Sequence, residues 1–327
     1  MSDVNPDTGS SVQFALGTVA ASEALIADVY LRLRSDLFRW ATLTGQTPQP
    51  RMGYIGQHLT SVVTGHRGGG SGGRGKDLVL ASGGHAEIKT CYRVDQLGTC
   101  RTCGATVPAI LLECPACGSS ALLRKADSKW LLAPKHDAEF AEFFEPQSYY
   151  FVLFDFEDLA DPTVINARIW EVDPKQNGFV YCMIDYYENI RTNSASAAPF
   201  NLWPFSLKFQ LMEPTLIYHA VIDADESITT VIFPGERGSE SAVDLDKFTN
   251  FSGTTGFTNA MITELADKFS IPVTLSGSRV NRLAALQQSR EESGFSNHIV
   301  VDLVAEAMYR DRIAPHFRWL PHGPAAV

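Results

Sequence analysis

Hydrophobic positions with helical spacing predict two helices near the start of the chain. A helix over about residues 20–42 would place six apolar side chains on one buried stripe, formed by Leu25, Val29, Leu31, Leu33, Leu37 and Trp40. A second helix is expected to begin near Tyr54 and to stop at Gly65, because glycine commonly ends a helix. Residues 1–12 are polar, contain proline and glycine, and are expected to be disordered.

Apolar runs bounded by turn residues then predict a sheet. Residues 78–80 and 86–89 are expected to form two strands joined by a turn at 82–84. Further runs predict strands at 149–156, 167–172, 207–211, 216–222 and 229–233, with helices at 137–144 and 180–191 between them. The fold class that follows is α/β, mixed α+β, with a central mixed sheet flanked by helices.

Asp77, Glu87 and Lys89 form the candidate catalytic group. Side chains alternate along a strand, so Glu87 and Lys89 would share one face while Ile88 points into the core. Mg²⁺ prefers oxygen ligands, which Asp77, Glu87 and the carbonyl group of Ile88 could supply. Lys89 could then orient or activate the attacking water. The alternative is an exposed charge pair on a hairpin, which the short triplet alone does not exclude because such patterns arise often by chance.

A second acidic group, formed by Asp155, Asp158 and Asp161, lies where the strand 149–156 is expected to end. Pro162 follows directly. These carboxylates also lack a partner lysine, which the catalytic triplet has. Both features favour a surface turn over a metal site. We therefore expect these carboxylates at the surface.

Four cysteines form two Cys-x-x-Cys pairs separated by ten residues, namely Cys100, Cys103, Cys114 and Cys117. Each pair can present two thiolates from a tight turn, and four thiolates make a closed tetrahedral Zn²⁺ site. A closed shell leaves no position for a water, so this zinc would be structural. Two disulfides or a redox pair are the alternatives. Disulfides need an oxidising compartment, whereas residues 1–6 lack the basic start and apolar core of a secretory signal, so we expect a cytoplasmic protein.

Length and charge restrict the organisation and the function classes. The 327 residues predict about two domains, 13–235 and a mainly helical region 236–327 for DNA binding or dimerisation. The net charge of −10 argues against a protein that coats nucleic acid through bulk charge, although an enzyme needs only a local basic cleft. No apolar run approaches the ~20 residues that span a bilayer, so a membrane role is not expected.

Basic side chains and one amide supply the candidate DNA contacts, which are Gln57, Arg67, Arg74, Lys76, Lys129, Arg279 and Arg282. The glycine-rich segment 65–76 partly matches the phosphate-binding pattern G-x-x-x-x-G-K-[ST], but Asp77 occupies the last position and a helix precedes the loop, which excludes nucleoside triphosphate binding. The loop is expected either to order over a DNA backbone or to be a plain linker. Residues 261–288 resemble a helix-turn-helix, with two packing helices as the alternative.

Several ordered segments between residues 50 and 215 resemble the MamI-type restriction endonucleases of the PD-(D/E)xK nuclease superfamily. The segments are Gly53–Leu59, Arg74–Leu78, Glu87–Cys91, Arg93–Leu97, the four cysteines, Asp127–Leu131, Tyr187–Ile190 and Leu202–Phe205. The ordered series is far more specific than any single motif. One departure is that Asp77 follows a lysine, where the wider superfamily has a proline.

The resemblance implies a type II restriction endonuclease with a restriction-endonuclease-like core and a zinc ribbon inserted at 97–124. Such an enzyme cuts both strands of double-stranded DNA with Mg²⁺ at an interrupted palindrome with GAT and ATC half-sites. Carried over, Asp77 and Glu87 are metal ligands and Lys89 is the catalytic lysine. Symmetric cutting favours a homodimer, and a cognate methyltransferase is expected as a functional partner in restriction-modification. The alternatives are a structure-specific or repair nuclease of the same fold and a non-catalytic zinc-ribbon DNA-binding protein.

Overall fold

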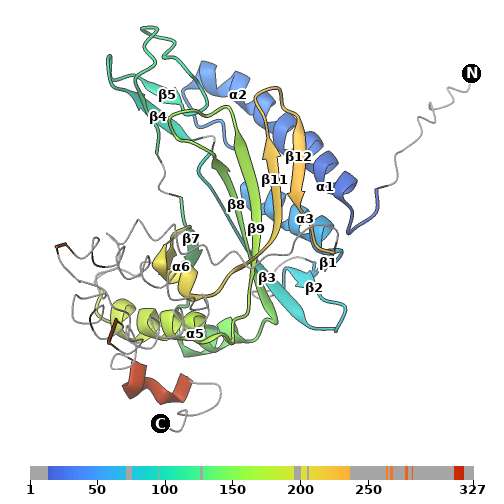
Figure 1. Cartoon of the computed structure of the whole chain (residues 1–327), viewed down its shortest axis with the longest axis vertical. Helices are drawn as coiled ribbons and strands as arrows, with labels where there is room; N and C mark the ends of the chain where they lie inside the picture. The colour runs from blue at the N-terminus through green and yellow to red at the C-terminus, as the bar shows by residue number, and fades with distance from the viewer. Residues whose placement is uncertain are drawn as a thin grey trace, which may run out of the picture.

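A seven-stranded mixed sheet forms the centre of the structure, a computed structural model that describes residues 14–70, 76–94, 96–125, 128–194, 200–204, 206–235, 263, 266–267, 277–278, 282 and 313–319 (Figure 1). In spatial order its strands are β1 (Arg67–Gly68), β2 (Leu78–Val79), β3 (His85–Tyr92), β8 (Ser148–Phe156), β9 (Ile165–Val172), β11 (Thr215–Ile222) and β12 (Ile228–Ile232). β3 and β8 pair in parallel, and the other neighbours pair antiparallel. The predicted mixed α/β fold class is confirmed.

Helices from the N-terminal part cover one face of the sheet (Figure 1). α1 (Val19–Leu25), the π-helical segment η1 (Ile26–Leu31) and α2 (Arg32–Thr44) follow one another directly, and α3 (Met52–Thr64) comes after them. Gly65 adopts a left-handed conformation with φ 75° and ends α3, as the sequence predicts. Ile55 and Leu59 of α3 are buried against the core that includes Ile88 of β3.

The predicted buried stripe along the first helix is confirmed for Leu31, which is 5% exposed, and in part for Leu25, which packs against the core, but not for three other members. Val29, Leu33 and Trp40 are 37%, 40% and 57% exposed, whereas Ile26 and Tyr30 are fully buried. The reason lies in η1, because a π-helical turn contains more residues than an α-helical turn and so rotates the buried face away from the spacing of a regular helix.

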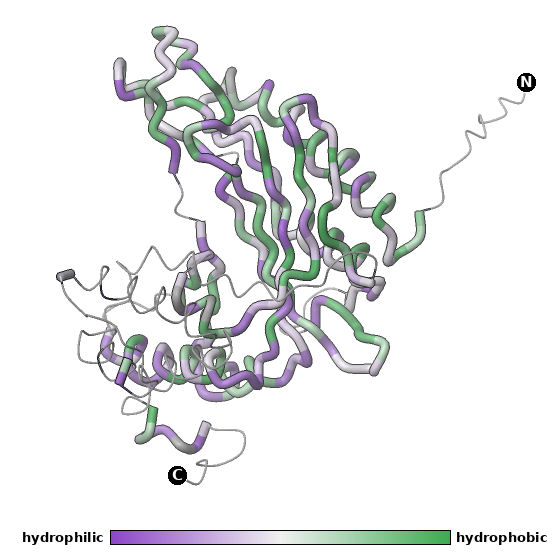
Figure 2. The backbone as a smooth tube through the Cα atoms, viewed as in Figure 1, coloured by the Kyte–Doolittle hydropathy of each residue, from purple (hydrophilic) through white to green (hydrophobic). Residues whose placement is uncertain are grey.

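A second layer made of short elements covers the part of the opposite face that carries Phe151 of β8 and Trp170 of β9. These are α4 (Asp137–Ala141), η2 (Glu142–Phe144), α5 (Asn177–Ile184), η3 (Asp185–Arg191), α6 (Leu207–Leu211) and a two-stranded sheet of β7 (Trp130–Leu132) and β10 (Phe200–Leu202). Trp130 lies in the middle of this layer, where its Nε1 donates to the Val152 carbonyl oxygen at 2.9 Å and its ring is 4.8 Å from that of Phe209. β8 is therefore buried on both faces, which explains the hydrophobic run from Phe151 to Phe154. Hydrophobic segments appear green along the central strands of the sheet in Figure 2.

Residues 207–211 form the helix α6, which corrects the predicted strand. The Ser206 hydroxyl oxygen accepts a hydrogen bond from the Phe209 N–H at 3.3 Å, so a cap begins the turn. Phe209 and Leu211 are both buried in the second layer. A run of five residues is too short for its hydrophobic pattern to separate a strand from a single helical turn.

The cysteine-containing insertion forms a small separate sheet at one end of the main sheet (Figure 1). Its strands are β4 (Leu97–Cys100), β5 (Thr106–Pro108) and β6 (Leu122–Leu123), in the order β5-β4-β6. Arg124 ties this ribbon to the main sheet, because its guanidinium group donates to the carbonyl oxygens of Ala109 and Leu111 in the ribbon and of Leu159 and Ala160 after β8. The three strands lie between β3 and β7 in the chain.

The C-terminal residues that the structure describes lie against the second layer. Ile313 is buried there, and η5 (Ala314–Trp319) packs the Trp319 ring edge-on against Phe140 at 4.7 Å. Arg318 Nη2 lies 2.7 Å from Glu188 Oε1 of η3. Most of the predicted segment 261–288, including Arg279, falls outside the described residues, and the division at residue 236 stays a prediction. Within the described parts of the chain, no helix is long and apolar enough to cross a membrane.

Candidate functional site

Asp77 lies just before β2, where two donors hold its carboxylate. The backbone N–H of Ile88 donates to Oδ2 at 2.8 Å, and the Gln57 side-chain amide of α3 donates to Oδ1 at 2.9 Å. The antiparallel register of β2 and β3, with Leu78 opposite Ala86, brings Asp77 beside Ile88. The sequence pattern predicted that these hairpin strands would bring the first carboxylate to the second, and the geometry agrees.

Glu87 and Lys89 project from β3 on the same face of the sheet. The Lys89 ammonium group donates to Glu87 Oε1, and the Glu87 residue is 5% exposed. Ile88 between them is 6% exposed and packs into the core on the α3 side, as the alternation predicts. The predicted alternative of an exposed charge pair on a hairpin is therefore wrong, because the carboxylate is buried and its hairpin forms part of the main sheet.

Two carboxylates in one partly buried place disfavour each other's charge. Burial raises the pKa of Asp77 above its ordinary value, and the nearby Glu87 charge raises it further. The Ile88 N–H, the Lys89 ammonium group and the Gln57 amide act in the opposite direction on that pKa. A cation bound between the two carboxylates would relieve their repulsion, so this group of residues fits a divalent metal ion with oxygen ligands.

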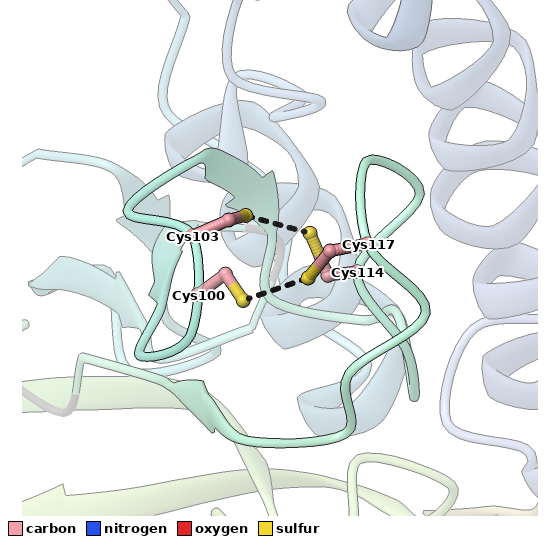
Figure 3. A group of neighbouring side chains, drawn as sticks. All are labelled: Cys100, Cys103, Cys114 and Cys117. Atoms are coloured by element: carbon pink, nitrogen blue, oxygen red, sulfur yellow. Dashed lines mark hydrogen bonds between the residues drawn. The ribbon is translucent and has the colours of Figure 1, made fainter.

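The four ribbon cysteines point toward one centre (Figure 3). Their Sγ atoms all lie within 4.8 Å of one another, with Cys100 and Cys117 3.6 Å apart and Cys103 and Cys114 3.7 Å apart. Four sulfur ligands at Zn–S distances of about 2.3 Å around a tetrahedral ion lie about 3.8 Å from each other, so the cluster could hold a metal ion such as zinc. All four cysteines are free thiols, and the separations are too long for disulfides.

The backbone around Cys100 favours the thiolate form of that side chain, which a metal ion requires. Hydrogen bonds from the backbone of Cys103, and then of Thr102, lower the pKa of the Cys100 thiol to about 6. Gly104 and Gly118, which follow the two pairs, have φ values of 74° and 69°, and both donate backbone hydrogen bonds to the first cysteine of their pair. Glycine therefore closes each turn in the left-handed conformation.

Comparison with known proteins assigns the chain to a family. Its sequence matches the family described as MamI restriction endonuclease over residues 39–243, which is more than half of the 327 residues. The chain belongs to this family. A stretch of 72 residues is 39% identical to the type II restriction enzyme MamI of Microbacterium ammoniaphilum and covers 22% of each of the two chains. The chain thus matches about a fifth of the length of that curated relative. No solved structure matches the chain.

The other candidate DNA contacts of this MamI-family chain are distributed over several elements. Gln57 is engaged with Asp77, and Lys129 lies just before β7. Arg67 is exposed on β1 and Lys76 is exposed beside Asp77. Arg282 donates to the Gly277 carbonyl oxygen at 3.3 Å and lies far along the sequence from the other candidates. Arg74 lies outside the described residues. Contact with DNA stays a prediction for all of them.

The glycine-rich segment is more ordered at its start than the loop that the sequence predicts. Arg67 and Gly68 form β1 and pair with β2, and the Gly69 N–H donates to the Asp77 carbonyl oxygen at 2.9 Å. A Cβ at Gly69 would lie 2.0 Å from the Lys76 carbonyl oxygen, so the close approach requires glycine. The two ends of the segment are thereby joined next to the candidate catalytic carboxylate.

Asp155 was expected at the surface and is in fact buried at 6% exposure. Its Oδ2 lies 3.4 Å from Arg93 Nη1, one residue beyond the end of β3. Burial raises the pKa of Asp155, and the charges of Arg93 and Arg168 oppose that rise. The sequence carried only a weak signal for this burial. Asp155 lies on the face of its strand that the odd-numbered residues form, and the other residues of that face are apolar. Asp158 and Asp161 are exposed in the turn, as predicted.

Proposed function

We propose that this chain is a type II restriction endonuclease that hydrolyses phosphodiester bonds of double-stranded DNA at a specific site with Mg²⁺. The observation that carries the proposal is the convergence of Asp77, Glu87 and Lys89 at one place on β2 and β3, in a chain of the MamI restriction endonuclease family. A structural zinc ion in the ribbon is part of the proposal.

The carboxylates of Asp77 and Glu87, together with the Ile88 carbonyl oxygen, would hold the metal ion. When bound, Mg²⁺ neutralises charge on the phosphate and lowers the pKa of a water ligand. Gln57 and the Ile88 N–H fix the orientation of the Asp77 carboxylate. Lys89 places a positive charge beside Glu87, where it can orient the water and stabilise the additional negative charge of the phosphate in the transition state.

The reaction is a displacement at phosphorus. The water oxygen loses one proton to solvent and forms a bond to phosphorus, the bond from phosphorus to one sugar oxygen breaks, and that oxygen takes a proton from solvent and leaves as a hydroxyl group. The burial of Glu87 limits access of bulk water to this place, so each charge acts more strongly than it would in solution.

The specificity and assembly are proposed from the family resemblance. The enzyme would recognise an interrupted palindrome with GAT and ATC half-sites. A homodimer with its two-fold axis on that of the DNA site would cut both strands symmetrically. A methyltransferase with the same specificity would be its functional partner.

The test is cleavage of mixed-sequence plasmid DNA with added Mg²⁺ by the wild-type chain and by Glu87→Gln. We expect discrete fragments from the wild type and none from Glu87→Gln, because the variant keeps the shape of the side chain and removes a ligand charge. Glu145→Gln is the matched control, since Glu145 is an exposed glutamate at the end of η2. Sequencing of the fragment ends then gives the recognition site and the cut position.

Three results would contradict the proposal. Binding of DNA without cleavage would favour a zinc-ribbon binding protein. Cleavage of branched DNA without sequence preference would favour a structure-specific nuclease. Equal activity of Glu87→Gln and Glu145→Gln would show that Glu87 of β3 takes no part in catalysis.

A further inference from the structure

A pocket of about 420 Å³ opens directly beside the proposed active site. One wall is β3 from Lys89 to Tyr92, and the other wall is the segment Ser128–Leu131 that leads into β7. Lys89 therefore belongs both to the proposed catalytic group and to this pocket. A DNA strand whose phosphate lies at Lys89 would pass over the pocket on one side of the cut.

Lys129 is the second cation of the pocket, and an aromatic ring fixes its position. Its Nζ lies 4.8 Å from the centre of the Trp203 ring. A ring holds an ammonium group without neutralising it, so the three N–H donors of Lys129 remain able to bind an anion. Among the residues that the structure describes, no carboxylate forms an ion pair with Lys129.

Hydrogen bonds hold both walls in place. The Gln96 amide donates to the Ser128 hydroxyl oxygen and to the Tyr92 carbonyl oxygen, and so connects the start of one wall to the end of the other. Arg93 pairs with Asp155 and donates to the Pro204 carbonyl oxygen at 3.5 Å, next to Trp203. Three of the segments that carry the family resemblance, around Gln96, Ser128 and Trp203, meet here. The pocket is thus a built feature with prearranged cations.

A second pocket shows that this charge is not a general property of the surface. It has a volume of about 480 Å³ and lies at the opposite edge of β8, where Glu171, Asp173 and Glu213 line it. Among the described residues that line it, none is basic. Lys89 pairs with Glu87, whereas Lys129 has no carboxylate partner among the described residues. In a chain of net charge −10, the Lys129 ammonium group therefore gives this pocket a positive charge that can bind an anion.

We propose that the Lys129 pocket binds a backbone phosphate of the cleaved DNA strand, next to the phosphate that is hydrolysed. Lys129 is the positioning residue: it fixes the strand so that the neighbouring phosphate lies at Asp77, Glu87 and Lys89. The inference rests on the proposed function, which it deepens by naming a contact that sets the register of the strand. A phosphate contact carries no sequence information, so its loss should weaken binding to all sequences alike.

The test measures duplex DNA binding as a function of salt, in the background Glu87→Gln so that no DNA is cut. Lys129→Met keeps the length of the side chain and removes its charge. Loss of one phosphate contact lowers the slope of log affinity against log salt by about 0.9, so over a fourfold rise in salt the chain with Lys129 should lose about 3.5-fold more affinity than Lys129→Met. Lys129→Arg should retain the slope. Lys175→Met, which removes an exposed lysine after β9, is the matched control and should also retain it.

A chemical version of the same test locates the phosphate. A neutral methylphosphonate is placed singly at each position near the cut site of the duplex. One such substitution should weaken binding of the chain with Lys129 and leave binding of Lys129→Met unchanged. The inference would be overturned if Lys129→Met and Lys175→Met had equal slopes. It would also be overturned if, at every position, a methylphosphonate weakened binding of Lys129→Met as much as it weakens binding of the chain with Lys129.

The outcome separates this inference from the proposed function. If the wild type cuts DNA and the Lys129→Met slope is unchanged, the pocket inference alone fails. If the wild type binds DNA without cutting and the slope falls, the nuclease proposal fails while the phosphate contact stands. Absence of any DNA binding would overturn both.

Discussion

Replacement of Gly56 by alanine should displace β3 and with it the proposed active site. Gly56 lies in α3, and a Cβ at this position would meet Thr90 of β3 at 2.0 Å from Oγ1 and at 2.9 Å from both Cβ and Cγ2. Rotation of the Thr90 side chain does not relieve this contact, because its own Cβ is already too close. The helix and the strand must therefore move apart.

The size of the effect follows from two opposing contributions. Alanine in place of glycine stabilises a helix by about 0.5–1 kcal/mol. Overpacking of a well-packed interior costs about 1–3 kcal/mol, and the upper end applies here because the contact involves a β-branched side chain that is stiff at χ1. We expect Gly56→Ala to lower the free energy of unfolding by about 2 kcal/mol.

Gly53→Ala is the matched control on the same helix. No atom lies within 4 Å of a Cβ at Gly53, so this variant should be slightly more stable than the wild type. Urea unfolding followed by circular dichroism compares the two variants, and plasmid cleavage reports the displacement of Glu87 and Lys89. Thr90→Ala should partly rescue Gly56→Ala. Equal stability of Gly56→Ala and Gly53→Ala would refute the reasoning, because the close contact would then have no energetic consequence.

Three further predictions concern the cysteine cluster, a buried tyrosine and the support of Asp77. Cys114→Ser should lose stoichiometric zinc in elemental analysis, whereas Cys182→Ala should keep it, because Cys182 is buried away from the cluster. Burial raises the folded-state pKa of Tyr218 from 10.0 to about 12, so its contribution to stability is present below pH 10 and is lost as the pH rises through about 12. As the pH rises from 10 to about 12, the free energy of unfolding of Tyr218→Phe, measured with urea, should therefore fall by about 2–3 kcal/mol less than that of the wild type. Gln57→Ala should lower the affinity for Mg²⁺ or the rate of cleavage about 10- to 100-fold, whereas His58→Ala, on the exposed side of α3, should leave both unchanged.

Local periodicity predicted the hairpin of the site well. Glu87, Ile88 and Lys89 alternate between the two faces of β3 as expected, because successive side chains of any strand point to opposite faces. The spacing of the cysteines likewise predicted a four-sulfur cluster, since each Cys-x-x-Cys turn is a local structure.

Features that depend on distant partners could not be predicted in this way. Asp155 is buried because Arg93, 62 residues earlier, lies beside it, and no local pattern encodes that pairing. The buried face of the first helix depends on η1, whose wider turn breaks the regular spacing. The secondary structure of residues 207–211 depends on Trp130, whose ring contacts the ring of Phe209 in the second layer. For Asp155 and for residues 207–211, tertiary packing overrides a weak local preference.

The position of the ribbon links the cysteine cluster to the Lys129 pocket. The ribbon begins after β3 of the main sheet and ends before β7 of the two-stranded sheet, so the two walls of the Lys129 pocket flank the insertion. Gln96 joins these walls, and Arg124 anchors the ribbon to the turn after β8. A folded ribbon thus fixes the separation between Lys89 on one wall and Lys129 on the other. A metal ion that takes no part in the chemistry would in this way set the distance between the catalytic lysine and the proposed phosphate contact.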